Sequence, residues 1–380
     1  LDVARAQAAV ARAAIVTEAE RPKPSLNVPI EHRAEQHPWV VVPNLDVTIE
    51  TAHKRGLRVQ QATEAANVAE LAIMQQAWQI RSSIRTQLAT LHAAQTGIAA
   101  LERQRTVQND LVEALQRRVE AGESSRIELT TTRIAARQAE LLRLDRLAFA
   151  AQARVRLATS IGIPESGLGT MRLRFDLALT EAPADLRERA LLGRPDILVS
   201  LADYAAAESA LQFEVARQYP DIHITPGFGW DAAVGRWDLG LTSLLPVLSR
   251  NRGPIGEAVA RRALSESNFL ALQARVIGAV DEAKAGYREA LRKVRESAQV
   301  IDEQQRQVDA AQKSFDAGET DRVALRSAEL ELESARVAHA DALVQAHAAW
   351  GALEDAIEQP LAGGGVSADI VTANPRSGWK

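Results

Sequence analysis

The chain has 380 residues, of which 46% are hydrophobic, 25% are charged and 4% are aromatic, and its formal net charge is −4. This near-neutral balance lacks the clustered excess of Lys and Arg that nucleic-acid binding requires, so nucleic acid is excluded as a partner. The absence of cysteine excludes disulfides, thiolate metal sites and cysteine nucleophiles. Ala, Leu, Gln, Glu and Arg dominate the sequence, a bias that is typical of long helices.

A nine-residue segment occurs twice. Residues 121–129 and 317–325 are identical at five of nine positions and lie 196 residues apart, and Pro24 and Pro220 share this offset. Matches spread over so long a stretch at one offset indicate a tandem duplication. We therefore predict a first repeat at residues 1–162, an irregular connection with one short helix at residues 163–194, a second repeat at residues 195–360 and a flexible tail at residues 361–380.

Each repeat is predicted to begin with an Ala-rich helix that ends near a proline, at residues 3–21 and 197–218. A pair of strands follows, within residues 25–51 and 221–246. Apolar and polar side chains alternate along these strands, which predicts one apolar and one polar face; the pattern is clearest where Leu45, Val47 and Ile49 alternate with Asp46, Thr48 and Glu50. Hairpin loops are expected at residues 31–38 and 229–236.

A very long helix follows each strand pair, at residues 57–119 and 255–315. Ile301, Val308 and Phe315 stand seven residues apart, and this spacing predicts that helices pack against helices as in a coiled coil. An Ala-Gly-Glu turn then breaks each long helix, at residues 121–125 and 317–321. Returning helices are predicted at residues 125–161 and 321–357.

The strand content points to an oligomer. The sequence has no run of about 18 apolar residues, so a membrane crossing would have to use strands. Four amphipathic strands cannot close a barrel, because known barrels begin at about eight strands and an open edge in lipid leaves backbone groups unpaired. Membrane-borne strands would therefore be pooled by at least two chains, and three chains would supply twelve strands.

The order of these motifs resembles that of TolC-type outer-membrane factors, and most closely the branch that serves heavy-metal resistance pumps. The resemblance spans about residues 1–360 and rests on the two Ala-Gly-Glu turns and on segments such as Pro226-Gly227-Phe228-Gly229-Trp230 and Asn251-Arg252-Gly253-Pro254-Ile255. It implies a homotrimer in the Gram-negative outer membrane, with a shared twelve-stranded β-barrel, a trimeric α-barrel of long helical hairpins in the periplasm, and a belt formed by residues 162–194 and the tail.

The implied function is a passive exit duct of a tripartite efflux system. Its partners would be a periplasmic adaptor protein, an inner-membrane pump of RND type and outer-membrane lipid, and its cargo would be small molecules or metal ions. A type I protein secretion channel, with the same architecture, is one alternative. A soluble helical-repeat scaffold with incidental strands is another, and solubility without detergent would distinguish it.

In the family the turns at the tips of the hairpins dock the adaptor, which here implies a docking surface at Ala121, Gly122, Glu123, Ser124, Ala317, Gly318, Glu319 and Thr320. In a purely structural role, the two glycines would supply a positive φ, and Ser124 and Thr320 would cap the next helix. We expect Arg126 and Arg322 to bond carbonyls or carboxylates across the tip, unless they are merely solvated.

Family members often narrow the tunnel with acidic side chains about six residues after the tip glycine. Glu128 occupies that position in the first repeat and is the candidate channel constriction, whereas the second repeat has Ala324 there. The resemblance therefore implies at most one acidic ring. The alternative for Glu128 is a solvated carboxylate on a helix face.

Neither a metal site nor an active site is predicted. The seven histidines include no pair at the i,i+4 spacing that places two ligands on one helical face, and no nucleophile elbow, phosphate-binding loop or catalytic carboxylate pair is present. We expect no cofactor and no catalysis. Among the tryptophans, Trp39, Trp230 and Trp237 flank the hairpins where an aromatic belt would lie, whereas Trp78 and Trp350 are expected to pack between helices.

Overall fold

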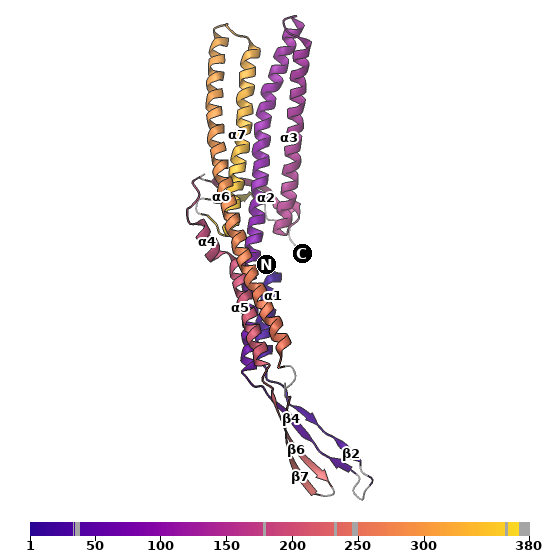
Figure 1. Cartoon of the computed structure of the whole chain (residues 1–380). Helices are drawn as coiled ribbons and strands as arrows, with labels where there is room; N and C mark the ends of the chain where they lie inside the picture. Colours follow the sequence, from indigo (N-terminus) through magenta and orange to yellow (C-terminus); the bar gives the residue numbers. More distant parts are fainter. Residues whose placement is uncertain are drawn as a thin grey trace. The chain divides into compact units, whose positions relative to one another are not determined.

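The computed structural model describes residues 1–32, 34, 39–177, 180–231, 234–244, 250–361 and 364–371. Its two halves share one order of elements, helix, strands, long helix and return helix (Figure 1). The first half comprises α1 (Asp2–Ala19), β1 (Ser25–Asn27), β2 (Ile30–His32), β3 (Trp39–Val41), β4 (Asn44–Ile49), α2 (Lys54–Glu120) and α3 (Arg126–Ile161). The second comprises α5 (Pro195–Ala216), β6 (Ile222–Asp231), β7 (Val234–Ser243), α6 (Arg252–Asp316) and α7 (Arg322–Ile357).

The chain divides into two compact units, and each takes segments from both halves. The strand unit consists of Leu1–Ala77 and Leu192–Arg275, and the hairpin unit consists of Trp78–Leu191 and the chain from Val276 onward. The units therefore do not coincide with the repeats predicted from the sequence. Within the described residues, no helix combines the length and the apolar character needed to cross a membrane.

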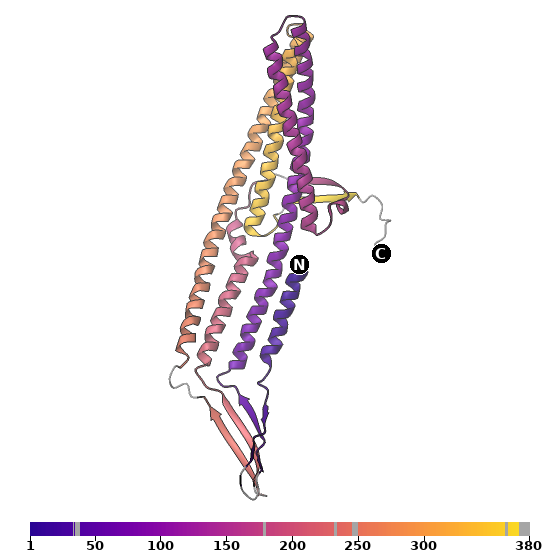
Figure 2. The ribbon, with the colours of Figure 1, turned by 90° about the vertical axis from the view of Figure 1, so that its right-hand side faces the viewer.

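The sheet of the strand unit has four antiparallel arms (Figures 1 and 2). An arm is a continuous stretch of extended chain. β1 and β2 make up the first arm, which is interrupted at Pro29, and β3 and β4 make up the second, which is interrupted at Pro43. Proline has no backbone N–H to donate to the ladder, which accounts for the interruptions. β6 pairs with β4 and β3 on one side and with β7 on the other.

The loops are shorter than the sequence predicted. β6 and β7 continue through residues 229–231 and 234–236, where Gly229 pairs with Arg236 and Trp230 with Gly235. The prediction of a loop over residues 229–236 was therefore wrong for these positions. In the first half, Glu31 and His32 belong to β2, and most of the remaining predicted loop lies outside the described residues.

Register gives the sheet two different faces. Val47, Ile224 and Leu241 lie opposite one another across three strands, and so do Thr48, His223 and Thr242 at the next position. The first face is apolar and the second is polar, as the alternation in the sequence predicted. The apolar side chains are largely uncovered: Trp237 is 81% exposed, and Leu239 and Leu241 are each 71% exposed.

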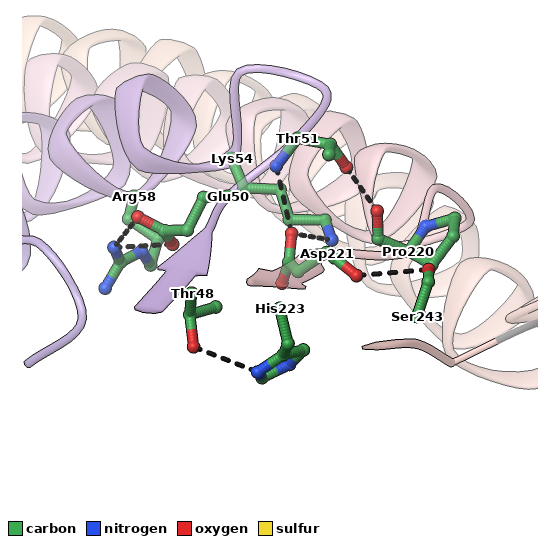
Figure 3. Close-up of polar contacts among 9 residues, drawn as sticks. All are labelled: Thr48, Glu50, Thr51, Lys54, Arg58, Pro220, Asp221, His223 and Ser243. Atoms are coloured by element: carbon green, nitrogen blue, oxygen red, sulfur yellow. Dashed lines mark hydrogen bonds and ion pairs between the residues drawn. The ribbon is translucent and has the colours of Figure 1, made fainter. Parts of the chain in front are cut away.

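A polar network joins the sheet to the long helix α2 (Figure 3). The Lys54 ammonium donates to Asp221 Oδ1 at 2.7 Å, and the backbone N–H of Thr51 donates to the same oxygen at 3.0 Å. Partial burial by itself would raise the pKa of Asp221, but these two hydrogen bonds outweigh it and the pKa is lowered. Arg58 pairs with Glu50 nearby, at 2.8 Å. The network fixes the start of α2 against the start of β6.

The hairpin unit contains two antiparallel helix pairs, in which the later parts of α2 and α6 pair with α3 and α7. Leu91 of α2 packs with Ala153, Leu157 and Ala158 of α3, and Leu168 closes the same cluster. A second cluster of Leu111, Leu115 and Leu129 packs against Val323 and Leu330 of α7. This second cluster holds the two hairpins together.

The connection and the tail pair with each other. The connection contains a short 3-10 helix, η1 (Glu165–Leu168), a strand, β5 (Thr170–Leu177), and a short helix, α4 (Leu186–Gly193). β5 forms an antiparallel ladder with β8 (Gly364–Val371). The expectation of a flexible tail is thus wrong for residues 364–371, because the ladder supplies their backbone with hydrogen-bond partners. The short helix was expected from the sequence, whereas the strand was not.

Candidate functional site

The two hairpin turns have the same backbone. Gly122 has a φ of 77° and Gly318 a φ of 74°. In the first turn the N–H of Glu123 donates to the carbonyl of Arg118 at 2.8 Å, and in the second the N–H of Glu319 donates to the carbonyl of Ser314 at 2.8 Å. Each of these hydrogen bonds runs from residue i to the carbonyl of residue i−5. Together with a glycine in the left-handed region, such a bond forms a Schellman motif, which ends the long helix. The glycines therefore have the positive φ that the sequence predicted.

The caps of the return helices lie one residue later than predicted. The Ser125 hydroxyl accepts a hydrogen bond from the N–H of Ile127 at 3.1 Å, and the Asp321 carboxylate accepts one from the N–H of Ala324 at 2.9 Å. Ser124 and Thr320 do not cap, because the six-residue turn places them inside the loop and leaves the extended conformation of an N-cap to the next residue.

Glu128 lies in the first turn of α3 and is exposed. Its carboxylate accepts a hydrogen bond from the Ser124 hydroxyl at 2.5 Å. The bond gives Ser124 a role other than capping, since it fixes the Glu128 side chain beside the turn. A constricting role for Glu128 stays a prediction, because it depends on neighbouring chains.

The cross-tip contact is made by an arginine that sequence reasoning missed. Arg118 of α2 donates to Asp321 Oδ2 at 2.5 Å and to the carbonyl oxygen of Glu123 at 3.3 Å. It therefore joins the turn of one hairpin to the helix cap of the other. In the described part of the chain, the side chains of Arg126 and Arg322 make no hydrogen bond or ion pair, so the expected polar network lies at Arg118 within one chain.

The predicted docking residues form an accessible surface on each turn. All of them are exposed except Ser124, which is half-buried. Gly122 and Gly318 have open space where a side chain would project. Ile127, directly after the first turn, is 78% exposed. Both turns thus expose a charged side chain, Glu123 or Glu319, and the first tip also exposes the apolar side chain of Ile127.

Two histidines meet although they lie far apart in the sequence. The rings of His92 on α2 and His347 on α7 stack with their centroids 6.5 Å apart. Burial lowers the pKa of both side chains, and the charge of His92 lowers that of His347 further. Within the described residues, no group of three or more His, Cys, Asp or Glu side chains could hold a metal ion.

The tryptophans lie in two kinds of surroundings. Trp39, Trp230 and Trp237 are exposed on the strands. Trp350 is buried against Tyr287, and Trp78 is half-buried with the Arg81 guanidinium over its ring.

Comparisons with known proteins relate this architecture to channels. Residues 186–358 match the model of a family described as outer membrane efflux protein. The cobalt-zinc-cadmium resistance protein CzcC of Cupriavidus metallidurans is 24% identical over 230 residues, which cover 60% of this chain and 55% of that protein. The match thus spans about half of the length of CzcC.

Solved structures share the fold over nearly the whole chain. The outer membrane protein VceC of Vibrio cholerae is 17% identical with a TM-score of 0.77, over 94% of this chain and 92% of that one. CusC is 16% identical with a TM-score of 0.76, over 94% and 89%. The outer membrane channel MtrE of Neisseria gonorrhoeae, in its open state, is 15% identical with a TM-score of 0.69, over 94% and 85%. The family and these neighbours are channels and not enzymes.

Proposed function

We propose, from the resemblance of this chain in sequence and in fold to TolC-type outer membrane efflux proteins, that three copies form the exit duct of a tripartite efflux system. The duct is a passive conduit. A pump in the inner membrane drives transport, and a periplasmic adaptor joins the pump to the duct. Each chain contributes its four sheet arms to a twelve-stranded barrel in the outer membrane and its helices to a tunnel in the periplasm.

The observation that carries the proposal is a row of uncovered apolar residues on α3. The row has a spacing of seven residues, and each member is exposed: Ile127, Ile134, Leu141, Ala148 and Val155. The duplicated positions on α7 are half-buried or buried in the same chain, because α7 lies against the α2/α3 hairpin. A seven-residue row is a helix-packing surface, and a second copy of the chain supplies the matching hairpin.

The sheet supports the same assembly. Its exposed apolar face suits lipid, and its polar face, with Asp46 bonded to His223 at 3.2 Å, suits a water-filled interior. In the described residues, the outer arms of the sheet each have a partner on one side only. Unpaired strand edges in lipid cost several kcal/mol for each lost hydrogen bond, so neighbouring chains must cover them.

The tips are the proposed docking surface for the adaptor, through residues 121–124 and 317–320. Glu128 is the proposed constriction, where three carboxylates in one ring would repel each other and favour cations. The name of CzcC, a cobalt-zinc-cadmium resistance protein, suggests divalent metal ions as cargo. The resemblance to the heavy-metal branch of TolC-type channels implies an RND-type pump as partner. In this arrangement the pump, and not the duct, selects the metal ion.

The test is the mass and the activity of the purified full-length chain. Light scattering in mild detergent is expected to give a particle of three times the 41.2 kDa of one chain, and planar bilayers are expected to show ion conductance. Replacing Glu128 by Ala should raise the conductance and weaken the cation preference. A monomer that stays soluble without detergent would contradict the proposal and favour a soluble scaffold.

A further inference from the structure

Basic side chains gather where the helices of the strand unit meet its sheet. Four stretches of chain, each counted with the adjoining end of its helix, connect a helix to a sheet arm: residues 20–24, 50–55, 217–221 and 244–252. Together they contain seven Lys or Arg residues and three acidic ones, in a chain whose net charge is −4. We call the seven basic residues the junction cations: Arg21, Lys23, Lys54, Arg55, Arg217, Arg250 and Arg252.

Hydrogen bonds hold the four stretches together as one surface. Arg55 Nε donates to the carbonyl oxygen of Ala19 at 2.6 Å and so joins the start of α2 to the end of α1. The Lys54 ammonium joins α2 to β6 (Figure 3). The side-chain amide of Asn251 donates to the carbonyl oxygen of Glu214 at 2.8 Å, which joins the start of α6 to the end of α5. Figure 2 shows the helices of this unit ending at one level, where the sheet begins.

Most of the junction cations are available to a partner. Arg21, Lys23, Arg250 and Arg252 are exposed, and in the described part of the chain their side chains make no hydrogen bond or ion pair. Arg55 is also exposed, and among the described residues its guanidinium bonds only one backbone carbonyl. Their charge is therefore not neutralised within the chain.

Helix stability does not account for these cations. A helix N-terminus carries a partial positive charge, so a cation is unfavourable there and an acidic residue is favoured. α2 begins with Lys54 and Arg55 and α6 with Arg252, and neither helix has an acidic residue in its first turn. The return helices differ, since α3 has Glu128 in its first turn and α7 has the acidic cap Asp321. A departure from a local rule of this kind is expected at a functional surface.

The apolar face of the sheet indicates what the cations meet. β6 has 10 residues, and at about 3.3 Å per residue such a strand spans the hydrocarbon part of a bilayer. The three exposed tryptophans lie towards its hairpin end, and the junction cations lie at the other end. Tyr219, between Arg217 and β6, is 59% exposed. Tyrosine and long basic side chains favour the boundary between hydrocarbon and headgroups. An acidic protein would match the cations but not the apolar surface beside them.

We propose that the junction cations bind the anionic headgroups of phospholipids in the leaflet that faces the helices. This binding requires the sheet arms to span a bilayer, so it rests on the proposed function, and it adds a lipid class and the residues that recognise it. Phosphate oxygens accept charge-assisted hydrogen bonds from guanidinium and ammonium groups. Since all four stretches contribute cations, each chain offers a basic band along one edge of its apolar surface.

The test compares two spin-labelled lipids: phosphatidylglycerol, whose headgroup is anionic, and phosphatidylcholine, whose headgroup has no net charge. Each is added in trace amounts to the full-length protein in phosphatidylcholine vesicles, and electron paramagnetic resonance measures the fraction held at the protein surface. We expect phosphatidylglycerol to associate about 5-fold more strongly, the effect of one cation near one headgroup. High salt should remove most of this preference, because it screens exposed charges.

Two variants locate the preference. One removes the four exposed cations that have no partner and should lose most of the preference: Arg21→Gln, Lys23→Gln, Arg250→Gln and Arg252→Gln. The matched control removes four exposed cations of α6 in the hairpin unit and should keep it: Lys284→Gln, Arg295→Gln, Arg306→Gln and Lys313→Gln.

Trimer formation and entry into vesicles are measured first, by light scattering and by flotation. A chain that does not enter vesicles would contradict the proposed function, and lipid binding with it. A trimer that enters vesicles but associates equally with both lipids would overturn the lipid proposal alone, and binding of a polyglutamate peptide by such a trimer would assign the cations to an acidic protein. An undiminished preference in the first variant, or an equal loss in the control, would also overturn it.

Discussion

The two return helices, α3 and α7, occupy duplicated places in the chain but have different surroundings. Ile134 on α3 and Leu330 on α7 stand 196 residues apart at matching positions. Leu330 packs against Leu111 and Leu115 of the same chain, whereas Ile134 is 54% exposed. Duplication has thus preserved a packing surface on α3 that a single chain does not cover. The unfilled copy on α3 marks where the next chain is expected to bind.

The largest expected effect tests this difference directly. Leu330→Glu places a charge without a partner inside the contact between the hairpins, at a cost of about 3–5 kcal/mol. The chain itself should become unstable, as measured by circular dichroism melting and by protease sensitivity. Ile134→Glu should leave the helical fold of the chain intact but dissociate the trimer in light scattering. Equal loss of fold from both changes would show that the two helices are not distinguished by their partners.

The next largest effect is expected from a charged substitution on the apolar face of the sheet. Val47→Asp puts a charge on the apolar face, which costs about 2–4 kcal/mol in the middle of a bilayer. We expect impaired assembly, measured as the amount of heat-resistant trimer in outer-membrane fractions. Asp46→Asn, on the polar face, is the matched control and should be nearly silent. Similar losses from both would mean that the two faces have been assigned wrongly.

The two hairpin turns, unlike the two return helices, are alike in structure, since both have the same backbone conformation. Replacing Gly122 and Gly318 together by Val forces a β-branched residue to a positive φ, at roughly 1–2 kcal/mol for each position. Open space surrounds both glycines, so the effect should come from backbone strain alone. Trimer formation should survive while efflux, measured as resistance of cells to the cargo, falls. Either single change should have a smaller effect, and full efflux by the double variant would argue against docking at the turns.

The smallest effect concerns the two stacked histidines. Their pKa values are lowered in the folded chain from the ordinary 6.5, so at mildly acidic pH the unfolded chain binds more protons than the folded one. Stability should therefore fall as the pH drops below about 6.5, and level off below the lowered pKa values. Melting temperatures recorded between pH 7.5 and 5 should show this slope. His92→Gln with His347→Gln should flatten it, and an unchanged slope would assign the effect to other groups.

Much of the fold could be predicted from the sequence. α2 and α6 extend no more than three residues beyond the predicted ends, and α3 and α7 end where expected, because long periodic helices carry a strong signal. The N-caps of α3 and α7 lie one residue later than predicted, because the capping position depends on local φ and ψ. β6 and β7 were longer than predicted because Gly229 and Gly235, which suggested a loop, lie within the ladder.

The candidate site was predicted less completely. The turn residues came from the repeated Ala-Gly-Glu motif, but the contact between Arg118 and Asp321 joins residues 203 apart. His92 and His347 likewise meet only through the packing of α2 on α7. Local sequence patterns do not predict such pairs, since the pairs result from tertiary structure. An arginine four residues before the turn glycine, together with an acidic cap on the other hairpin, is the signal that could have suggested the first contact.

Disulfide cross-linking between copies tests the closed ring of three chains, because these 380 residues contain no cysteine. In one chain Leu330 of α7 packs against the cluster that contains Leu115 of α2. The duplicated positions are Ile134 of α3 and Ala311 of α6, which are expected to lie close together across neighbouring chains. The double variant Ile134→Cys with Ala311→Cys should form covalent dimers and trimers on mild oxidation, and no larger species, while either single variant should form no trimer. A double variant that stays monomeric after oxidation, or that forms dimers without trimers, would contradict a closed ring of three chains.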